Sequence, residues 1–424
     1  MKFLDNELKR VLSVSIPPNS TILFGPHQAS ELVDSLMPAS TREFQPIPAS
    51  KDSIVTHVLM APWIDQVIDI YSELRELKSQ LSPETRVVVV SVSRLWSRYG
   101  RRFNRVSKQK TSSNWIPPSE VVNLFELSGY EFISRRRAVL MPIRIPILSR
   151  LINKALCDLP ILRHLSIFNI ITFRPQIANR NPEPSVSVIV AARNEAGNIQ
   201  NLVNRLPRLA PRMELIFVEG GSKDNTWDVI QEVIAKHTQT TEYSIRAIKQ
   251  TGVGKGDAVR HGFANANGDI FIILDADLSV PPEELSQFIE SIRNNHCEFA
   301  NGSRLVYTME NKAMQFLNLI GNRLFGIAFT FLLGQSVRDT LCGTKALRAS
   351  DYNRIAMQRS YFGEFDPFGD FDLLFGASRL GLKIRDIPVH YKERVYGSTN
   401  ISRFRHGILL LRMTVVAARR LRFV

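Results

Sequence analysis

Two series of short apolar runs, each alternating with helix-like stretches, constrain the fold of this chain most strongly. A segment that contains three prolines, residues 173–184, separates the two series. The runs are rich in β-branched residues and comprise residues 21–24, 53–59 and 86–92 before that segment and residues 186–190, 214–218 and 270–274 after it. Such alternation predicts parallel sheets covered by helices. We therefore expect two doubly wound α/β domains, residues 1–172 and 185–424, joined by a linker at residues 173–184.

The composition is that of a globular protein with a basic surface. Of the 424 residues 44% are hydrophobic and 22% are charged, which excludes a disordered or collagenous chain. The 54 Lys and Arg residues exceed the 40 Asp and Glu residues, and the resulting net charge of +14 favours nucleic acid or an anionic membrane surface as a partner. The three cysteines lie far apart, which excludes a disulfide framework and a CxxC-type zinc site and indicates a reducing cytosol.

The sequence predicts neither an export signal nor a membrane span. Asp5 and Glu7 place acids where a secretory signal needs a basic and then an apolar stretch. The longest uncharged apolar run towards the C-terminus, residues 324–337, is shorter than the roughly 18 residues that a spanning helix needs. We expect this run to be a buried core helix or a segment in the membrane interface.

Two carboxylates stand one residue apart at the end of a predicted strand, since Asp275 and Asp277 follow residues 270–274. Such a pair can hold one hard divalent cation, Mg²⁺ or Mn²⁺, while substrate phosphates complete its coordination. A turn that contains two aspartates is the alternative. The location favours a functional interpretation, because open α/β sheets bind ligands at the carboxyl ends of their strands.

Polar and glycine-rich segments also flank the other strands of the second series, at residues 191–195, 219–226 and 252–258. Glycine-rich turns that enter helices expose backbone N–H groups to anionic oxygens, and Lys255 adds a positive charge for a phosphate. A Walker loop is excluded, because Gly256 and Asp257 follow Lys255 where that loop needs Ser or Thr.

These residues resemble the inverting glycosyltransferases of family 2, which have the GT-A fold, and within them the polyprenyl-phosphate branch that includes dolichol-phosphate mannose synthases. The resemblance covers residues 184–424 and rests on seven segments that follow the family's order. The segments are residues 188–195, 218–226, 254–258, 275–277, 301–304, 339–345 and 369–372. Seven segments in order are far more specific than any one of them.

The resemblance implies a nucleotide-sugar donor, UDP- or GDP-linked. The matching donor-binding positions are Ala192, Arg193, Glu195, Glu219, Lys255, Gly256 and Asp275. Asp275 and Asp277 match the family's pair of ligands for Mg²⁺ or Mn²⁺. Residues 192–195 also suit an N-terminal cap of the following helix. Glu219 and Gly220 replace two aspartates found in most members, which leaves the selectivity for base and ribose open.

The resemblance also implies a phosphate acceptor. Arg304 matches the arginine that meets the acceptor phosphate, and a guanidinium suits phosphate through its two-pronged geometry. A surface salt bridge is the alternative role of Arg304. Asn322 fits the acceptor pattern of an apolar helix in which Asn318 stands where arginine is common. Arg403 belongs to the last basic loop, which lies near the acceptor in the family.

Asp370 and Asp372 stand where members that use hydroxyl acceptors have a general base, and with Arg304 they are the predicted catalytic residues. Capping of the apolar helix at residues 373–380 is the alternative. A phosphate acceptor arrives ionised, because the second pKa of a phosphate group is about 6. It therefore needs no base. The two aspartates therefore act as base or as positioning groups without deciding which acceptor is used.

Two segments combine apolar and basic residues. Arg405, Arg412 and Arg419 recur every seven residues, which predicts a basic amphipathic helix on anionic lipid, with a core helix and a solvated tail as the alternative. Residues 138–173 either pack between the domains or touch the membrane, and the sequence does not separate these roles.

The first domain resembles, faintly, a class I methyltransferase-like domain. That family expects several glycines after its first strand, whereas Phe24 is followed by Gly25 and Pro26. The sequence therefore predicts a degenerate domain that serves docking or stability.

The leading hypothesis is a metal-dependent inverting transfer of a sugar from a nucleotide sugar to a polyprenyl phosphate. We expect a peripheral enzyme at the cytoplasmic face of the cell membrane, in cell envelope glycan biosynthesis. The second hypothesis is transfer to a glycan or glycolipid hydroxyl with Asp370 or Asp372 as base, and the third is a non-catalytic membrane scaffold that retains the fold. No nucleic-acid partner is expected, because the basic residues gather with apolar helices and no recognition motif is present.

Overall fold

The computed structural model describes residues 2–24, 36, 40–43, 55–61, 69–96, 116–159, 162–177, 182–237, 243–307, 316–362, 369–394, 396 and 403–423. For residues 2, 40–43, 94, 316–320 and 403–407 it describes the backbone alone. The chain divides into two compact units. One unit consists of Met1–Ala178, Arg379–Gly381 and Arg419–Val424, and the other of Asn179–Ser378 and Leu382–Ala418.

The N-terminal unit is built on a six-stranded sheet in the order β2-β1-β3-β4-β6-β5. Its strands are β1 (Thr21–Phe24), β2 (Ser40–Glu43), β3 (His57–Met60), β4 (Arg86–Val92), β5 (Tyr130–Ala138) and β6 (Phe168–Pro175). The strands β1 to β4 are parallel, and β6 runs antiparallel to both β4 and β5. The three runs expected before the proline segment are thus β1, β3 and β4.

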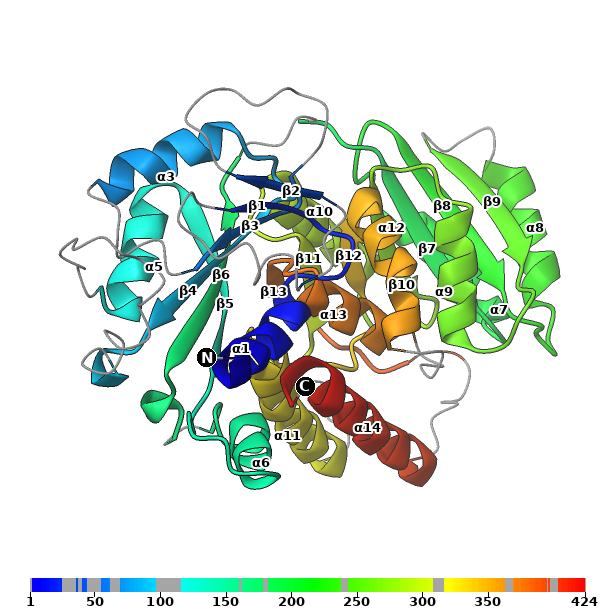
Figure 1. Ribbon diagram of the computed structural model, residues 1–424. Coiled ribbons are helices and arrows are strands. Elements are labelled where there is room, and N and C mark those ends of the chain that lie inside the picture. Colours follow the sequence, from blue (N-terminus) through cyan, green and yellow to red (C-terminus); the bar gives the residue numbers. More distant parts are fainter. Residues whose placement is uncertain are drawn as a thin grey trace. The chain divides into compact units, whose positions relative to one another are not determined.

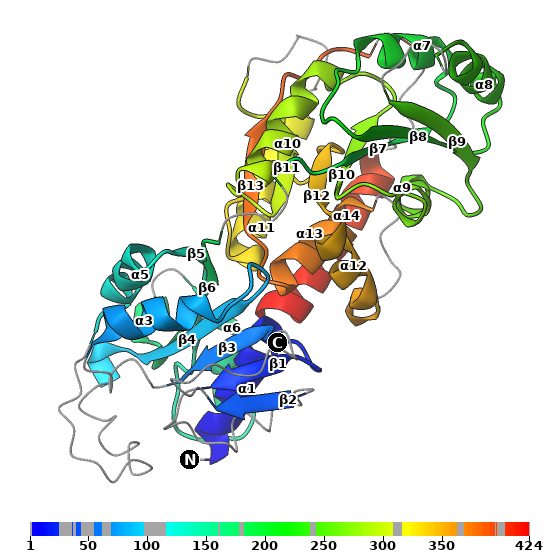
Figure 2. The ribbon, with the colours of Figure 1, turned by 90° about the horizontal axis from the view of Figure 1, so that it is seen from above.

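Helices cover both faces of this sheet, as Figure 2 shows. The helices α3 (Ile70–Ser79) and α5 (Pro118–Leu127) pack on one face, and α1 (Lys2–Ser15) packs on the other. Val87 and Val89 of β4 point to the first face, while Val88 and Val90 point to the second. All four side chains are buried, which explains the uninterrupted valine run of a parallel strand.

The end of β6 differs from the expected linker. Phe173–Pro175 fall in residues 173–184, yet they complete β6. Phe173 is fully buried and stacks on Phe125 of α5 at a ring-centroid distance of 4.1 Å. Apolar packing across the sheet therefore extends the strand past the point where local composition suggests a linker.

The C-terminal unit is built on a seven-stranded sheet in the order β13-β11-β12-β10-β7-β8-β9. Its strands are β7 (Val186–Ala192), β8 (Met213–Glu219), β9 (Ser244–Lys249), β10 (Ile270–Asp275), β11 (Phe299–Ser303), β12 (Lys345–Arg348) and β13 (Ile384–Pro388). β12 runs antiparallel to β10 and β11, and the other neighbouring strands are parallel. The carboxyl ends of the six other strands therefore meet the amino end of β12 at one edge.

The helices of this unit follow the strands in alternation and are labelled in Figure 1. They are α7 (Ala196–Arg205), α8 (Thr226–His237), α9 (Lys255–Ala264), α10 (Leu285–Arg293), α11 (Phe316–Leu333), α12 (Ala349–Met357), α13 (Asp370–Arg379) and α14 (Arg403–Ala417). Both units are α/β, as the sequence predicts. Within the described part of the chain, no helix has the length and apolar character that crossing a bilayer requires.

Candidate functional site

The predicted site residues gather at one edge of the C-terminal sheet because the strands that carry them end there. Ala192 is the last residue of β7, Glu219 of β8 and Asp275 of β10. Arg304 directly follows β11, and Lys345 begins the antiparallel β12. This is the carboxyl edge of the parallel strands, where open α/β sheets bind ligands.

Ala192 and Glu195 are built into the turn between β7 and α7, whereas Arg193 is exposed beside them. The carbonyl oxygen of Ala192 accepts the Gly220 N–H at 2.9 Å. Glu195 occupies the N-cap position of α7, but its carboxylate accepts the side-chain amide of Asn198 at 2.6 Å rather than a backbone N–H of the helix. Burial raises the pKa of Glu195.

The carboxylate of Glu219 holds the turn that follows β8. Its Oε1 accepts the Ser222 N–H at 2.5 Å, and Gly221 adopts the left-handed conformation, with φ of +68°. Glu219 is only 6% exposed. Glutamate at this position thus stabilises the turn, and its contact with a donor stays a prediction.

Asp275 and Lys255 form an ion pair where β10 and α9 meet. Burial favours the neutral form of Asp275. The positive charge of Lys255 and, to a smaller extent, that of Lys345 nevertheless lower its pKa overall. Burial likewise opposes the charge of Lys255, yet Asp275 and Asp370 together raise its pKa. Gly343 lies so near that a Cβ there would collide with both members of the pair.

Asp277 is paired with Arg394, a residue that the sequence analysis did not single out. Arg394 Nη2 lies 2.5 Å from Asp277 Oδ2, and Nη1 lies 3.5 Å from Glu195 Oε1. Asp277 Oδ1 also accepts the Ser279 N–H at 3.0 Å. Arg394 follows β13 and reaches the same edge, so a search beyond the carboxyl end of every strand would have found it.

Asp275 and Asp277 fit a divalent cation by their chemistry. Carboxylate oxygens are the ligands that Mg²⁺ and Mn²⁺ prefer, and the two side chains are 27% and 13% exposed. Among the described residues no group of three or more His, Cys, Asp and Glu side chains gathers to hold a metal ion. Oxygen atoms of substrate phosphates and of water would complete the coordination of such an ion.

Asp370 and Asp372 lie in the first turn of α13, and both are paired with cations. The Asp370 carboxylate lies 3.2 Å from Nζ of the fully buried Lys345. The Asp372 carboxylate lies 2.7 Å from Nε of Arg359. Their location at the helix start agrees with the capping alternative, because negative charge stabilises a helix N-terminus. The start of α13 also lies next to Gly256, a predicted donor-binding position, since a Cβ at Gly369 would collide with Gly256.

Arg304 forms a buried ion pair with Asp339. Its Nε and Nη2 donate to the two carboxylate oxygens at 2.7 and 2.9 Å, and its guanidinium lies 5.0 Å from the centre of the Tyr391 ring. Asp339 is fully buried, and despite that burial the charge of Arg304 lowers its pKa. The alternative foresaw a surface salt bridge, whereas this pair lies in the interior with Arg304 11% exposed.

Asn322 joins this ion pair from α11. Its Nδ2 donates to Asp339 Oδ1 at 3.3 Å. Several buried polar atoms nearby have no hydrogen-bond partner among the described residues, namely Asn322 Oδ1, Asn301 Oδ1, Ser303 Oγ, Thr340 Oγ1 and Thr344 Oγ1. The structure brings Arg304 and Asn322 together on Asp339, and their contact with an acceptor stays a prediction. The side chain of Arg403 lies outside the described residues, and only its backbone, at the start of α14, is placed.

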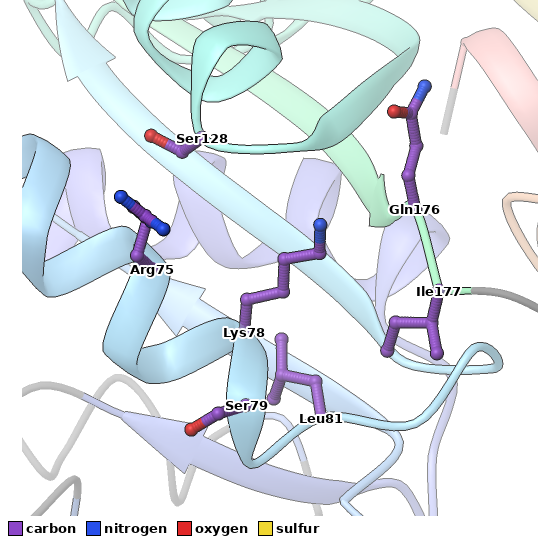
Figure 3. A pocket seen from close by; sticks show the side chains of 7 residues that line it. All are labelled: Arg75, Lys78, Ser79, Leu81, Ser128, Gln176 and Ile177. Atoms are coloured by element: carbon purple, nitrogen blue, oxygen red, sulfur yellow. The ribbon is translucent and has the colours of Figure 1, made fainter.

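A pocket in the N-terminal unit contains none of the predicted residues (Figure 3). It is lined by Arg75, Lys78, Ser79, Leu81, Ser128, Gln176 and Ile177. These residues lie at the C-terminal ends of α3 and α5, before β4 and after the antiparallel β6. The pocket is therefore opposite to the carboxyl edge of the parallel strands. A Cβ at Gly129 would collide with the Lys78 ammonium, so this charge lies at the negative end of the α5 dipole.

Comparison with known families matches residues 187–356 to the model described as "Glycosyl transferase family 2". The chain is 37% identical over 124 residues to the dolichol-phosphate mannosyltransferase of Pyrococcus furiosus, a match that covers 28% of this chain and 33% of that protein. It is 26% identical to an undecaprenyl-phosphate 4-deoxy-4-formamido-L-arabinose transferase of Pseudomonas fluorescens, over 53% of this chain and 62% of that protein. It is 25% identical to the polyprenol monophosphomannose synthase of Mycolicibacterium smegmatis, over 53% and 84% of the two chains.

The chain spans about a third of the Pyrococcus relative and less than two thirds of the Pseudomonas one. Among solved structures it is similar to the glucosyl-3-phosphoglycerate synthase of Mycobacterium tuberculosis, in a complex with Mn²⁺, UDP and glucosyl-3-phosphoglycerate. That match has a TM-score of 0.40 and 17% identity and covers 56% of this chain and 80% of the other. The family expected from the sequence is confirmed for the C-terminal half. The matched residues do not include the N-terminal domain, so its methyltransferase-like resemblance stays a prediction.

Proposed function

We propose that this chain, whose residues 187–356 belong to glycosyl transferase family 2, moves a sugar from a UDP- or GDP-linked donor to a polyprenyl phosphate. The reaction is metal-dependent and inverts the anomeric centre. The observation that carries the proposal is the arrangement of Asp275 and Asp277, each with its own cation, at the carboxyl edge of the parallel strands. Carboxylates that share a divalent ion beside two cations suit a diphosphate leaving group.

The donor binds along the ends of β7, β8 and β10 in this proposal. Asp275 and Asp277 hold Mg²⁺ or Mn²⁺, which when bound neutralises the charge that develops on the leaving nucleoside diphosphate. Lys255 places a fixed positive charge beside the same phosphates. The remaining donor-binding positions are Ala192, Arg193, Glu195, Glu219 and Gly256.

The acceptor is proposed to be a lipid phosphate because Arg304 directly follows β11, at the same edge as Asp275, and a guanidinium suits phosphate oxygens. Arg304 and Asn322 share Asp339, which fixes the orientation of the guanidinium. The names of the three curated relatives include dolichol phosphate, polyprenol and undecaprenyl phosphate, which supports this acceptor class. Arg403, at the start of α14, is proposed as a further acceptor-binding residue.

Transfer to a glycan or glycolipid hydroxyl is the second candidate, with Asp370 or Asp372 as base. Both carboxylates are paired with cations, Asp370 with Lys345 and Asp372 with Arg359. A phosphate acceptor arrives ionised and needs neither carboxylate as base, which favours the first candidate. A scaffold without turnover is the third candidate, and the intact Asp275 and Asp277 weigh against it.

A membrane location follows from the same proposal, because a polyprenyl acceptor is embedded in lipid. The helix α14 exposes a stripe of Ile408, Leu411 and Val415, and the nearby α11 exposes Leu324 and Ile327. Arg412 and Arg419 are exposed beside the α14 stripe. We assign these helices to the cytoplasmic face of the cell membrane as a peripheral contact.

The N-terminal unit, up to the segment at residues 173–184, is assigned docking or stability rather than methyl transfer.

The test is transfer from radiolabelled UDP- and GDP-sugars to undecaprenyl phosphate in detergent, with Mn²⁺ or EDTA. We expect a lipid product that forms only with metal and that mild acid cleaves as a glycosyl phosphate. Metal-dependent nucleotide binding without a lipid product from any donor would redirect the assay to hydroxyl acceptors. A protein that binds no nucleotide would fit the scaffold and contradict the proposed transfer.

A further inference from the structure

The helix α6 (Leu148–Ala155) of the N-terminal unit, labelled in Figure 1, buries polar side chains. Ser149 and Asn153, four residues apart on one face, are only 2% and 3% exposed. Asn153 Oδ1 accepts the N–H groups of Leu140 and Met141 at 3.0 and 2.8 Å, and its Nδ2 donates to the Met141 carbonyl oxygen at 3.1 Å. Hydrogen bonds to the preceding loop therefore fix the orientation of α6.

Five apolar side chains of α6 and the segment before it are exposed. We call them the α6 patch, which consists of Ile143, Ile145, Ile147, Leu148 and Leu151. Ile147 is 78% exposed and Leu151 is 58% exposed. A surface helix ordinarily does the reverse, and buried polar groups beneath exposed apolar ones are the informative exception. Apolar surface presented in this way marks an interaction site.

The backbone at the start of α6 reinforces this interpretation. Ile147 has φ of +68° and ψ of −52°, and the Leu148 N–H donates to the Pro146 carbonyl oxygen at 2.8 Å. Ile147 is therefore the central residue of a γ-turn, which is strained for a β-branched residue. Such outliers persist only where the surroundings enforce them, and they gather at functional positions. Here the strained residue carries the most exposed side chain of the patch.

The charges around the α6 patch identify its partner. Arg144, Arg150 and Lys154 are exposed among the apolar residues. The sequence contains no acidic residue between Glu131 and Asp158. A short helix with apolar side chains outwards and cations beside them suits the boundary between the headgroups and acyl chains of an anionic bilayer.

We propose that the α6 patch inserts into the headgroup region of a bilayer that contains anionic lipid, as a membrane contact of the N-terminal unit. Lipid chains cover the five apolar side chains, and the three cations bind lipid phosphates. This contact does not depend on the proposed transfer reaction. It gives the N-terminal unit a function of its own in holding the chain at a membrane surface.

A site-specific probe tests the insertion directly. The native cysteines Cys157, Cys297 and Cys342 are buried, so Leu151→Cys can be labelled selectively with an environment-sensitive nitrobenzoxadiazole dye in the full chain. We expect a blue shift and a severalfold rise in emission with phosphatidylcholine–phosphatidylglycerol vesicles. Leu127→Cys, at a position 63% exposed on α5, is the matched control and should show neither change. A probe at position 151 that stays in water while the protein sediments with the vesicles would overturn the proposal.

Partition measurements separate the apolar and charged contributions. We expect Leu148→Ser/Leu151→Ser to lower the vesicle partition coefficient about tenfold. Arg150→Gln/Lys154→Gln should lower it about fivefold per charge on anionic vesicles, and added salt should reduce that difference. Leu127→Ser should bind like the wild type, and all variants should keep wild-type transfer in detergent, which separates this test from the proposed function.

A second copy of the chain is the competing occupant of the α6 patch. Sedimentation equilibrium without lipid measures it, and we expect no association that depends on Leu148 and Leu151. A dimer that Leu148→Ser/Leu151→Ser dissociates, with no change in vesicle binding, would assign the patch to self-association and overturn the proposal.

Discussion

Single residues at the candidate site are defined by their partners rather than by their type. Asp277 has Arg394 as its cation and Asp275 has Lys255, so each predicted metal ligand is already neutralised within the chain. A divalent ion at this pair must therefore compete with Arg394 for Asp277. Nucleotide phosphates would compensate, because they offer the displaced arginine another anion.

Asp277→Ala should weaken Mn²⁺-dependent nucleotide binding by more than about tenfold, because a lost ligand costs at least as much as a lost supporting group. Calorimetry with UDP and GDP, with and without Mn²⁺, measures the effect. Asp228→Ala, an exposed acid in the first turn of α8, is the matched control. Unchanged Mn²⁺ dependence in Asp277→Ala would remove this residue from the metal site.

Arg304→Gln should destabilise the chain by about 3–5 kcal/mol, because it leaves the fully buried Asp339 without a counter-charge. Urea unfolding measures this cost, and Arg304→Gln/Asp339→Asn should recover part of it. The double variant also tests the acceptor role, since it lacks the cation without the buried unpaired charge. We expect its KM to rise for the lipid acceptor and to stay unchanged for the donor. Wild-type KM values for both substrates would remove Arg304 from the acceptor site.

At the scale of elements, α14 carries apolar side chains on its exposed side as well as on its buried side. α14 buries Leu410, Met413 and Ala417 on one side while Ile408 and Leu411 stay exposed on another. The helix is therefore apolar on two faces. One face packs in the core, and the exposed face is the one for which lipid contact stays a prediction.

Ile408→Ser/Leu411→Ser should raise the KM for the lipid acceptor about tenfold when transfer is measured on lipid vesicles, and it should leave transfer in detergent unchanged. Thermal stability should stay within about 0.5 kcal/mol of the wild type, because both side chains are exposed. Met357→Ser, at a position 80% exposed on α12, controls for the general effect of removing surface apolar area. Equal losses in vesicles and detergent would assign the stripe to catalysis or folding instead.

At the scale of the whole molecule, buried carboxylates make stability depend on pH. Burial alone would raise the pKa of Glu214, but the N–H of Asn267, the Ser187 hydroxyl and Arg246 together lower it. A depressed carboxylate pKa stabilises the fold above the unfolded value of about 4.3. That contribution is lost as the pH falls through the folded-state pKa. Asp339 acts in the same direction.

We therefore expect the free energy of unfolding to fall as the pH is lowered from about 5 to about 3. Glu214→Gln should be less stable at neutral pH by about 1–3 kcal/mol, because Arg246 loses its counter-charge and the hydrogen bonds weaken. Its stability should also change less over the same pH range. Urea unfolding at a series of pH values measures both quantities, and a slope equal to that of the wild type would exclude Glu214 as a source of the pH dependence.

The alternation of strands and helices and the polar segments at the strand ends could be predicted from the sequence, because both follow from local periodicity and from the residues that directly follow each strand. These patterns predicted Asp275, Asp277 and Lys255 at one edge of one sheet, whereas Arg304 was assigned through the resemblance to the family. The pairing of the charges could not be predicted, because it depends on contacts between residues that are distant in the sequence. Arg394 lies 117 residues from Asp277, and Arg304 lies 35 residues from Asp339.

The local sequence pattern also did not predict that the α6 patch faces outwards. The hydrogen bonds of Ser149 and Asn153 to the preceding loop bury the polar face of that helix and leave apolar residues exposed. Periodicity tells which residues share a face of a helix, but the contacts of the folded chain decide which face is buried.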